Sequence, residues 1–233
     1  MKALAVNHQL DAGPGVFAEE AHAKGWALDE WLIPSGEPPP ADPLTYDAVL
    51  SFGGAMHADQ ESEHPWLAQE KEILSGLLDA GVPTMGVCLG SQLLAEAAGA
   101  SVVRADEPEI GWFDIEVTTQ GARDPVIGAL APRFEALQWH SYRSPLPPGA
   151  VELALSPLAL QAYRIGEVAW GIQFHAEVSE IDAASWAVNY AVDEDAVRIG
   201  IDPDFLGAQI LERIGEWNAL GRGLCGRFLE AAS

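Results

Sequence analysis

The chain has few basic residues. Its 233 residues include 12 lysines and arginines against 35 aspartates and glutamates, so the formal net charge is −23 at pH 7. A surface of that sign repels the phosphate backbone of nucleic acids. A nucleic-acid partner is therefore not expected. The acidic residues are spread along the chain, which is typical of a solvated surface that keeps a protein soluble.

Cysteines and long apolar runs are also scarce. Two cysteines, Cys88 and Cys225, do not make a disulfide framework, and this usage favours a reducing environment. No apolar run reaches the roughly 18 residues that a membrane-spanning helix needs. The first residues, MKALAVNHQLDAGPG, lack the apolar core and cleavage site of a secretory signal. We therefore expect a cytoplasmic protein that binds no membrane.

The chain up to residue 98 alternates between two kinds of apolar pattern. Runs typical of strands cover residues 2–7, 26–33, 46–52 and 82–87, and helical spacing covers residues 15–24, 65–79 and 89–98. This alternation favours a parallel sheet with helices on both faces.

The pattern changes in the later part of the chain. Short strand-like runs separated by turns occur at residues 112–119, 134–140, 151–156, 158–165 and 168–174. They indicate an antiparallel addition that returns to the main sheet. Residues 181–231 have mostly helical spacing. No internal repeat or low-complexity tract interrupts the chain, so one domain is expected.

The stretch GVCLGSQ, residues 86–92, places Cys88 between two glycines, after a strand-like run and before a helical one. Gly-x-Cys-x-Gly is the cysteine form of the nucleophile elbow, a sharp strand-to-helix turn that exposes the reactive side chain. Gly86 and Gly90 supply the small neighbours that a crowded turn requires. The N-terminus of the following helix favours a negatively charged sulfur, and the N–H of Leu89 faces a developing oxyanion. A small buried cysteine between core elements is the alternative.

Residues 170–178, WGIQFHAEV, place His175 and Glu177 directly after a strand-like run. On an extended chain, residues i and i+2 project to the same side. Glu177 can therefore orient the imidazole of His175, as the third member of a catalytic triad does. Zinc deaminases also contain His-x-Glu, but their signature requires Pro-Cys-x-x-Cys, which this chain lacks. No metal site is expected.

These motifs resemble those of the class I glutamine amidotransferases, and more closely the stand-alone members similar to the glutaminase domain of GMP synthase. The matching stretches, in family order, are residues 51–61, 86–100, 109–118, 137–150 and 169–179. The resemblance implies an α/β fold: a flavodoxin-like, open, mixed and mostly parallel sheet with helices on both faces, plus a small antiparallel strand addition. The expected amidotransferase domain covers residues 1–190, and residues 191–233 are expected to form a C-terminal helical extension packed on it.

The resemblance also implies the roles of the reacting groups. Cys88 is expected to be the nucleophile and His175 the general base and acid, with Glu177 orienting His175. The main-chain N–H groups of Gly54 and Leu89 correspond to the oxyanion hole of the family.

A second set of residues corresponds to those that hold the bound glutamine. Gln92 is one helical turn past the cysteine, and His140, Ser141 and Tyr142 belong to a loop whose backbone contacts the α-amino and α-carboxyl groups. No cofactor is implied.

The implied function is hydrolysis of the glutamine side-chain amide through a Cys88 thioester, which gives glutamate, and ammonia for a partner synthase. A stand-alone hydrolase of γ-glutamyl peptides or conjugates would use the same residues. A non-catalytic regulatory protein of the same fold is a third candidate, which the intact set of Cys88, His175 and Glu177 disfavours.

The remaining conspicuous side chains are interpreted as structural. Surface positions in the loop after the glycine pair are expected for His57, Asp59 and His64, and a place at the mouth of the site is the alternative. Core positions are expected for Trp112, Trp139 and Trp170. Cys225 lies in a helical, partly apolar segment and is interpreted as a structural thiol.

Overall fold

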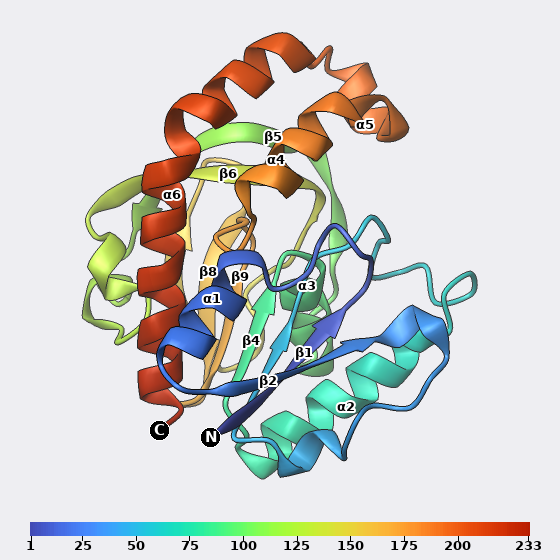
Figure 1. The fold of residues 1–233 in the computed structure, drawn as a ribbon, viewed down its shortest axis with the longest axis vertical. Helices are drawn as coiled ribbons and strands as arrows, with labels where there is room; N and C mark the ends of the chain where they lie inside the picture. Colours follow the sequence, from blue (N-terminus) through green and yellow to red (C-terminus); the bar gives the residue numbers. More distant parts are fainter.

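A nine-stranded sheet runs through the centre of the protein, as the computed structural model of residues 1–233 shows (Figure 1). Its strands are β1 (Lys2–Asn7), β2 (Ala27–Leu32), β3 (Ala48–Ser51), β4 (Thr84–Val87), β5 (Val103–Val117), β6 (Arg133–Arg143), β7 (Val151–Leu155), β8 (Leu160–Ile165) and β9 (Ala169–Ile172). They are ordered β2-β1-β3-β4-β9-β8-β7-β5-β6 across the sheet.

The sheet has a parallel half and an antiparallel half. Strands β2, β1, β3, β4 and β9 pair in parallel. Strands β9, β8, β7, β5 and β6 pair in antiparallel fashion. Strand β9 therefore joins the two halves, and this confirms both the expected α/β fold and the return of the antiparallel addition to the main sheet.

Six helices surround the sheet. They are α1 (Gly15–Ala23), α2 (Trp66–Ala80), α3 (Leu89–Ala97), α4 (Glu180–Val188), α5 (Glu194–Arg198) and α6 (Pro203–Ala231). Short 3-10 turns cover Ile33–Ser35, Pro43–Thr45, Gly121–Arg123, Gly128–Leu130 and Tyr190–Val192. Each strand and helix expected up to residue 98 is present, and the expected helical tail is confirmed. No helix combines the length and apolar character needed to cross a bilayer.

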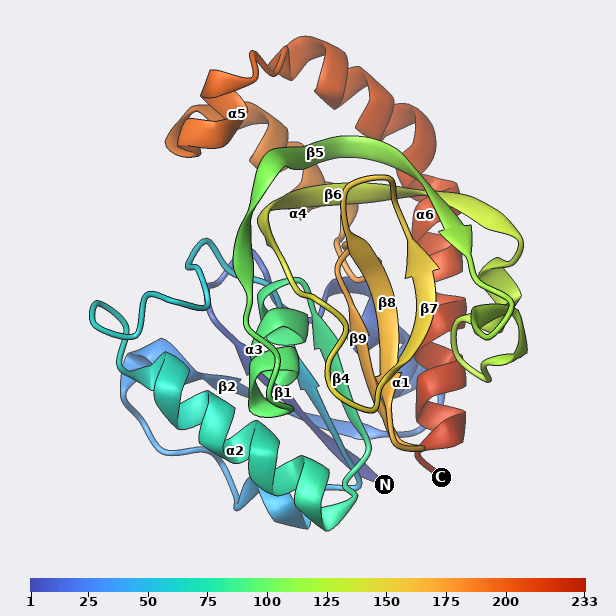
Figure 2. The same cartoon turned by 180° about the vertical axis from the view of Figure 1, so that it is seen from behind.

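Alternate residues of β1 face two separate cores. Ala3 and Ala5 belong to the cluster that includes the buried side chains of α1 and α6. Leu4 and Val6 belong to the cluster that includes those of α2 and α3. This alternation follows from the two-residue period of a strand and shows that helices cover both faces, as expected. Figures 1 and 2 show the two faces in turn.

Strand β5 is longer than the sequence pattern indicated, because it begins at Val103 rather than near Trp112. Its first residues are mostly exposed and charged, and a register shift between Arg104 and Glu109 interrupts their pairing with β6. Such a segment has no alternation of apolar and polar residues, so periodicity does not reveal it. In Figure 2 the β5–β6 pair arches across the upper part of the sheet, and α5 and the start of α6 lie above it.

Helix α6 brings the last residues of the chain close to the first ones. It packs on α1 and α4. The ammonium of Lys24 lies 2.7 Å from the carboxylate of Glu230, and the hydroxyl of Ser233 lies 3.5 Å from the sulfur of Met1. The two termini lie side by side in Figure 1. The division of the chain at residue 190 remains a prediction.

Candidate active site

Cys88 occupies a strained turn between β4 and α3. Its φ of 51° and ψ of −108° make it the only non-glycine residue of the chain with a positive φ. The neighbouring glycines are required for space. A Cβ on Gly86 would lie 2.5 Å from the main-chain oxygen of Gly90, and a Cβ on Gly90 would collide with the main-chain oxygen of Ser51. Backbone strain held by its surroundings in this way is characteristic of functional positions.

His175 comes shortly after β9, the strand that pairs with β4, and its ring is hydrogen-bonded to Glu177. The two atoms joined are Nδ1 of His175 and Oε1 of Glu177, 2.8 Å apart, and both side chains are buried. Burial lowers the pKa of His175, but the negative charges of Cys88 and Glu177 outweigh it and raise that pKa well above its ordinary value. The arrangement favours the protonated imidazolium of His175.

The glycine pair after β3 passes close to both reactive side chains. A Cβ on Gly53 would lie 3.0 Å from Cε1 of His175 and 3.7 Å from Cβ of Cys88. A side chain at this position would press on the imidazole of His175. The next residue, Gly54, lines the cavity, and its N–H donates to no acceptor of the chain.

The site residues expected from the sequence converge on one cavity of about 450 Å³. Those that line it are Gly54, Cys88, Leu89, Gln92, His140, Ser141, Tyr142 and His175. Glu177 lies behind His175 and is 1% exposed. The cavity opens where the carboxyl ends of β1, β3, β4 and β9 meet, which is where open α/β sheets generally bind ligands.

His140, Ser141 and Tyr142 lie in the last residues of strand β6 and not in a loop, because they pair with the first part of β5. Gln92 connects the elbow helix to this end of β6. Its Nε2 donates to the main-chain oxygen of Tyr142 and to Oε1 of Gln173, both at 3.1 Å. The sulfur of Cys88 lies 3.8 Å from the main-chain oxygen of Trp139, which directly precedes these three residues on β6. The backbone at this end of β6 is therefore held against the cysteine.

A wall of the cavity comes from a segment in which the sequence motifs predict no site residue. Trp186 and Asn189 from the end of α4, together with Val192, Asp193, Glu194 and Asp195, line the cavity. No motif marks these residues, and they come together with Cys88 only through the tertiary fold.

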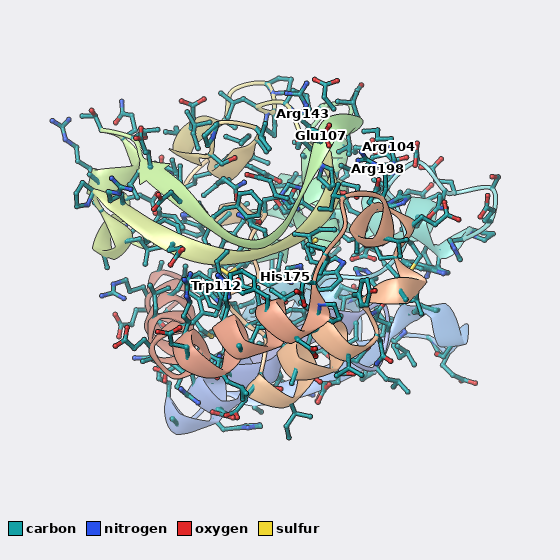
Figure 3. The ribbon with its side chains drawn as sticks, turned by 90° about the horizontal axis from the view of Figure 1, so that it is seen from above. Arg104, Glu107, Trp112, Arg143, His175 and Arg198 are labelled. Atoms are coloured by element: carbon teal, nitrogen blue, oxygen red, sulfur yellow. The ribbon has the colours of Figure 1, made fainter.

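Three side chains attach this segment and the rest of α5 to the antiparallel strands. The indole of Trp139 donates to Oδ2 of Asp193 at 2.8 Å. Arg104 donates to both carboxylate oxygens of Asp195, at 2.8 and 2.7 Å. Arg198 contacts Asp195 at 3.0 Å and Glu107 at 3.3 Å. Figure 3 shows Arg104, Glu107 and Arg198 gathered where α5 meets β5.

Two of the residues interpreted as structural lie at the site instead. His57 lines the cavity and stacks on Tyr142 with ring centroids 4.2 Å apart, and its burial lowers its pKa. Trp139, on β6, also lines the cavity. Asp59 is exposed as expected.

The other structural interpretations agree with the fold. Trp170 is buried in the core, and Trp112 is partly buried against it. Cys225 is buried on α6, where its sulfur lies 3.6 Å from the main-chain oxygen of Phe17. Burial raises its pKa to about 12, which disfavours the reactive thiolate form.

Known proteins match this chain in sequence and in fold. The family model described as "Glutamine amidotransferase class-I" matches residues 36–185. A glutamine amidotransferase-like protein of Salmonella typhimurium is 26% identical over 223 residues, which cover 94% of this chain and 90% of that protein. The glutamine-hydrolysing GMP synthase subunit of Natronomonas pharaonis is 30% identical over 176 residues, which cover 73% of this chain and 86% of that protein.

A hydrolase and a solved structure complete the comparison. The γ-glutamyl-L-1-hydroxyisopropylamide hydrolase of a Pseudomonas species is 29% identical over 150 residues, 60% of this chain and 50% of that enzyme. The crystal structure of a glutamine amidotransferase from Thermotoga maritima matches with a TM-score of 0.88 at 29% identity, and the match covers 99% of this chain and 98% of that one.

Proposed function

The chain belongs to the class-I glutamine amidotransferase family, and on that basis we propose that it hydrolyses the side-chain amide of glutamine to glutamate through a thioester on Cys88, releasing ammonia for a partner synthase. One observation carries the proposal: the strained Cys88 and the Glu177-bound His175 line the same cavity, where the N–H of Gly54 has no acceptor within the chain.

The first half-reaction forms the thioester. The thiolate of Cys88 attacks the carbonyl carbon of the glutamine side-chain amide, and the electron pair of the carbonyl moves to its oxygen. The N–H groups of Gly54 and Leu89 stabilise this oxyanion, and one such donor typically contributes about 3–4 kcal/mol. The imidazolium of His175 then gives its proton to the amide nitrogen. The carbon–nitrogen bond breaks, ammonia leaves, and the carbonyl re-forms as a γ-glutamyl thioester.

The second half-reaction returns the enzyme to its starting state. Neutral His175 removes a proton from a water molecule, which attacks the thioester carbon. The carbon–sulfur bond breaks, the thiolate of Cys88 is restored, and glutamate leaves. Glu177 keeps Nδ1 of His175 as a donor throughout, so Nε2 is the atom that exchanges protons with the substrate.

A second candidate function is hydrolysis of γ-glutamyl amides that carry a larger amine. Two observations favour it. The cavity of about 450 Å³ lies in the range of sites for drug-sized ligands, which are larger than glutamine. One relative is named as a hydrolase of a γ-glutamyl amide. The chemistry is the same, with the amine leaving in place of ammonia.

The test combines covalent labelling with turnover. A diazo-ketone analogue of glutamine, followed by mass spectrometry, is expected to modify Cys88 and leave Cys225 unmodified. Cys88→Ala should abolish hydrolysis, and Cys225→Ser is the matched control that should retain it. Hydrolysis by Cys88→Ala at the wild-type rate would contradict the proposed nucleophile.

Comparing substrates separates the two candidates. Glutamine and a series of γ-glutamyl alkylamides should be assayed with the isolated chain, with ammonia or amine as the measured product. Faster hydrolysis of the alkylamides would favour the conjugate hydrolase. Preference for glutamine would favour the glutaminase that serves a synthase. Binding of these compounds without hydrolysis of any would favour the non-catalytic regulatory protein.

A further inference from the structure

A buried histidine that the proposed mechanism does not use lies beneath the glycine loop. His8 follows β1 and is 1% exposed. Its Nδ1 lies 3.1 Å from the main-chain oxygen of Gly53, and its Nε2 lies 2.6 Å from Oε2 of Glu70. Both ring nitrogens therefore face acceptors, one on the glycine loop and one on α2.

Glu70 holds this histidine from the buried face of α2. The carboxylate is 1% exposed, and its second oxygen accepts a hydrogen bond of 2.6 Å from the hydroxyl of Ser51, at the end of β3. The ring of Trp66 stacks on the imidazole with centroids 5.1 Å apart. Burial lowers the pKa of His8, but Glu70 and the oxygen of Gly53 outweigh it and raise that pKa above its ordinary value. An imidazolium can donate from both nitrogens at once.

The contact with Gly53 bears on the orientation of the oxyanion hole. The carbonyl of Gly53 and the N–H of Gly54 belong to one peptide unit, and in a trans peptide these two groups point in opposite directions. A hydrogen bond that fixes the carbonyl toward His8 therefore fixes the N–H on the other side. Glycines on both sides of this peptide give it no steric preference of its own, because glycine adopts both signs of φ at similar cost.

The loop is also packed closely against the histidine. A Cβ on Gly54 would lie 2.8 Å from Cβ of His8 and 3.1 Å from Cδ2 of Leu89. Gly54 is thus held between the end of β1 and the first residue of α3. Leu89 is the other proposed oxyanion donor, so the same packing sets the spacing of the two N–H groups.

We propose that His8, held by Glu70, is a positioning residue that keeps the Gly53–Gly54 peptide turned with the N–H of Gly54 toward the oxyanion, so that the hole is formed without a partner protein. This inference rests on the proposed hydrolysis at Cys88. All the groups involved belong to this chain: Ser51 on β3, Glu70 and Trp66 on α2, and His8 after β1.

Two substitutions of His8 separate its two contacts. In His8→Asn the amide nitrogen occupies about the position of Nδ1, so the donor to Gly53 is retained. In His8→Gln the amide nitrogen occupies about the position of Nε2, so the contact with Glu70 is retained and the donor to Gly53 is lost. Loss of an oxyanion donor typically lowers kcat about 10²- to 10³-fold. We expect a fall of that order for His8→Gln with little change in KM, and a smaller fall for His8→Asn.

Alkylation of Cys88 by iodoacetamide is the internal control. That displacement at a saturated carbon creates no oxyanion, so its rate should be the same in the wild type and both variants. Slower alkylation in parallel with slower hydrolysis would mean that the variants distort the cysteine itself, and it would overturn the positioning role. Equal hydrolysis by His8→Gln and His8→Asn would also overturn it.

Hydrogen exchange of the amides in residues 52–56 tests the inference independently of activity. We expect faster exchange there in His8→Gln than in His8→Asn or the wild type, with α6 unchanged. If no variant and no wild-type sample hydrolyses any substrate, the proposed function fails, yet the exchange data still decide whether His8 orders the loop. Glu70→Gln keeps the size of the side chain, and it replaces the His8 variants in the exchange experiment if they do not fold. Unchanged exchange in that variant would overturn the role of Glu70.

Discussion

The indole nitrogen of Trp217 donates a 2.7 Å hydrogen bond to the main-chain oxygen of His175. One residue later, Nδ2 of Asn218 donates to the main-chain oxygen of Val178 at 2.8 Å. A Cβ on Gly221, one turn further along α6, would collide with the main-chain oxygen of Ala176. The last helix therefore holds the backbone of the segment that carries His175 and Glu177.

Trp217→Phe is expected to weaken both the fold and the activity. The substitution keeps an aromatic ring but leaves a buried carbonyl without its donor, which typically costs about 1–3 kcal/mol. The backbone of His175 then loses a restraint, so kcat should fall while KM changes little. Urea unfolding and steady-state kinetics measure the two effects.

Trp112→Phe is the matched control for that substitution. Trp112 packs edge-to-face on Trp217 with centroids 5.8 Å apart, but its own indole nitrogen has no hydrogen-bond partner. Figure 3 shows Trp112 and His175 between the β5–β6 arch and the helices. The control should therefore lose less stability than Trp217→Phe, and equal losses would assign the effect to ring packing alone.

Glu177→Gln is expected to lower kcat about 10²- to 10⁴-fold with the fold intact, because removal of the charge destabilises the imidazolium and allows the wrong tautomer of His175. The amide has nearly the same volume as the carboxylate. Glu180→Gln, on the exposed first turn of α4, removes the same charge three residues away and should leave kcat unchanged. Retention of wild-type kcat by Glu177→Gln would contradict the role of the carboxylate.

Gly90→Ala is expected to destabilise the protein, because the new methyl group would collide with the main-chain oxygen of Ser51. Overpacking of this kind typically costs about 1–3 kcal/mol. Gly215→Ala in α6 is the opposite case: nothing lies within 4 Å of its Cβ position, so the helix should gain up to about 1 kcal/mol. Chemical unfolding of the two variants should show shifts of opposite sign.

Stability should depend on pH through His175. Burial lowers its pKa, but Cys88 and Glu177 raise it well above the ordinary value, so folding favours the protonated ring. A raised pKa contributes stability that is fully present below the unfolded value of about 6.5 and is lost as pH rises through the folded value.

The comparison of the wild type with His175→Gln isolates that contribution, because His8 is present in both. The difference between their free energies of unfolding should fall as pH rises above about 6.5, by at most about 1.4 kcal/mol per pH unit. A difference that stays constant or grows over that range would contradict the assignment.

Local patterns in the sequence were sufficient for the elbow and for the parallel half of the sheet. The strand before Cys88, the helix after it and the glycines on either side all lie within a few residues of one another, and the spacing of His175 and Glu177 is equally local. The crowding at Gly86 and Gly90 is what their positions in the motif indicated.

The wall formed by residues 186–195 could not be found in this way. Asp193 and Asp195 are polar residues in a segment without a motif, and they reach the cavity through contacts with Trp139 and Arg104, which are far away in the sequence. Nothing in the local pattern distinguishes them from the many acidic residues of a solvated surface.

The sequence contains one sign of the buried pair formed by His8 and Glu70, from which a buried charge could have been predicted. The buried residues of α2 are Leu67, Glu70, Leu74 and Leu77, so the helical spacing places this glutamate on the apolar stripe. A charged residue on such a stripe requires a buried partner. The sequence does not show that the partner is His8, because the residues around His8 form no motif.

Because Met1 contacts Ser233, these two residues could be joined without changing how the strands and helices are arranged in space. A short peptide joining these two ends, with new ends opened in the exposed Pro-rich loop at residues 36–40, would give a circular permutant with the same sheet. The cavity lies at the carboxyl ends of the parallel strands, whereas Met1 precedes the amino end of β1. Such a permutant would place both new ends away from α6, and the helix that holds His175 would become an internal part of the chain.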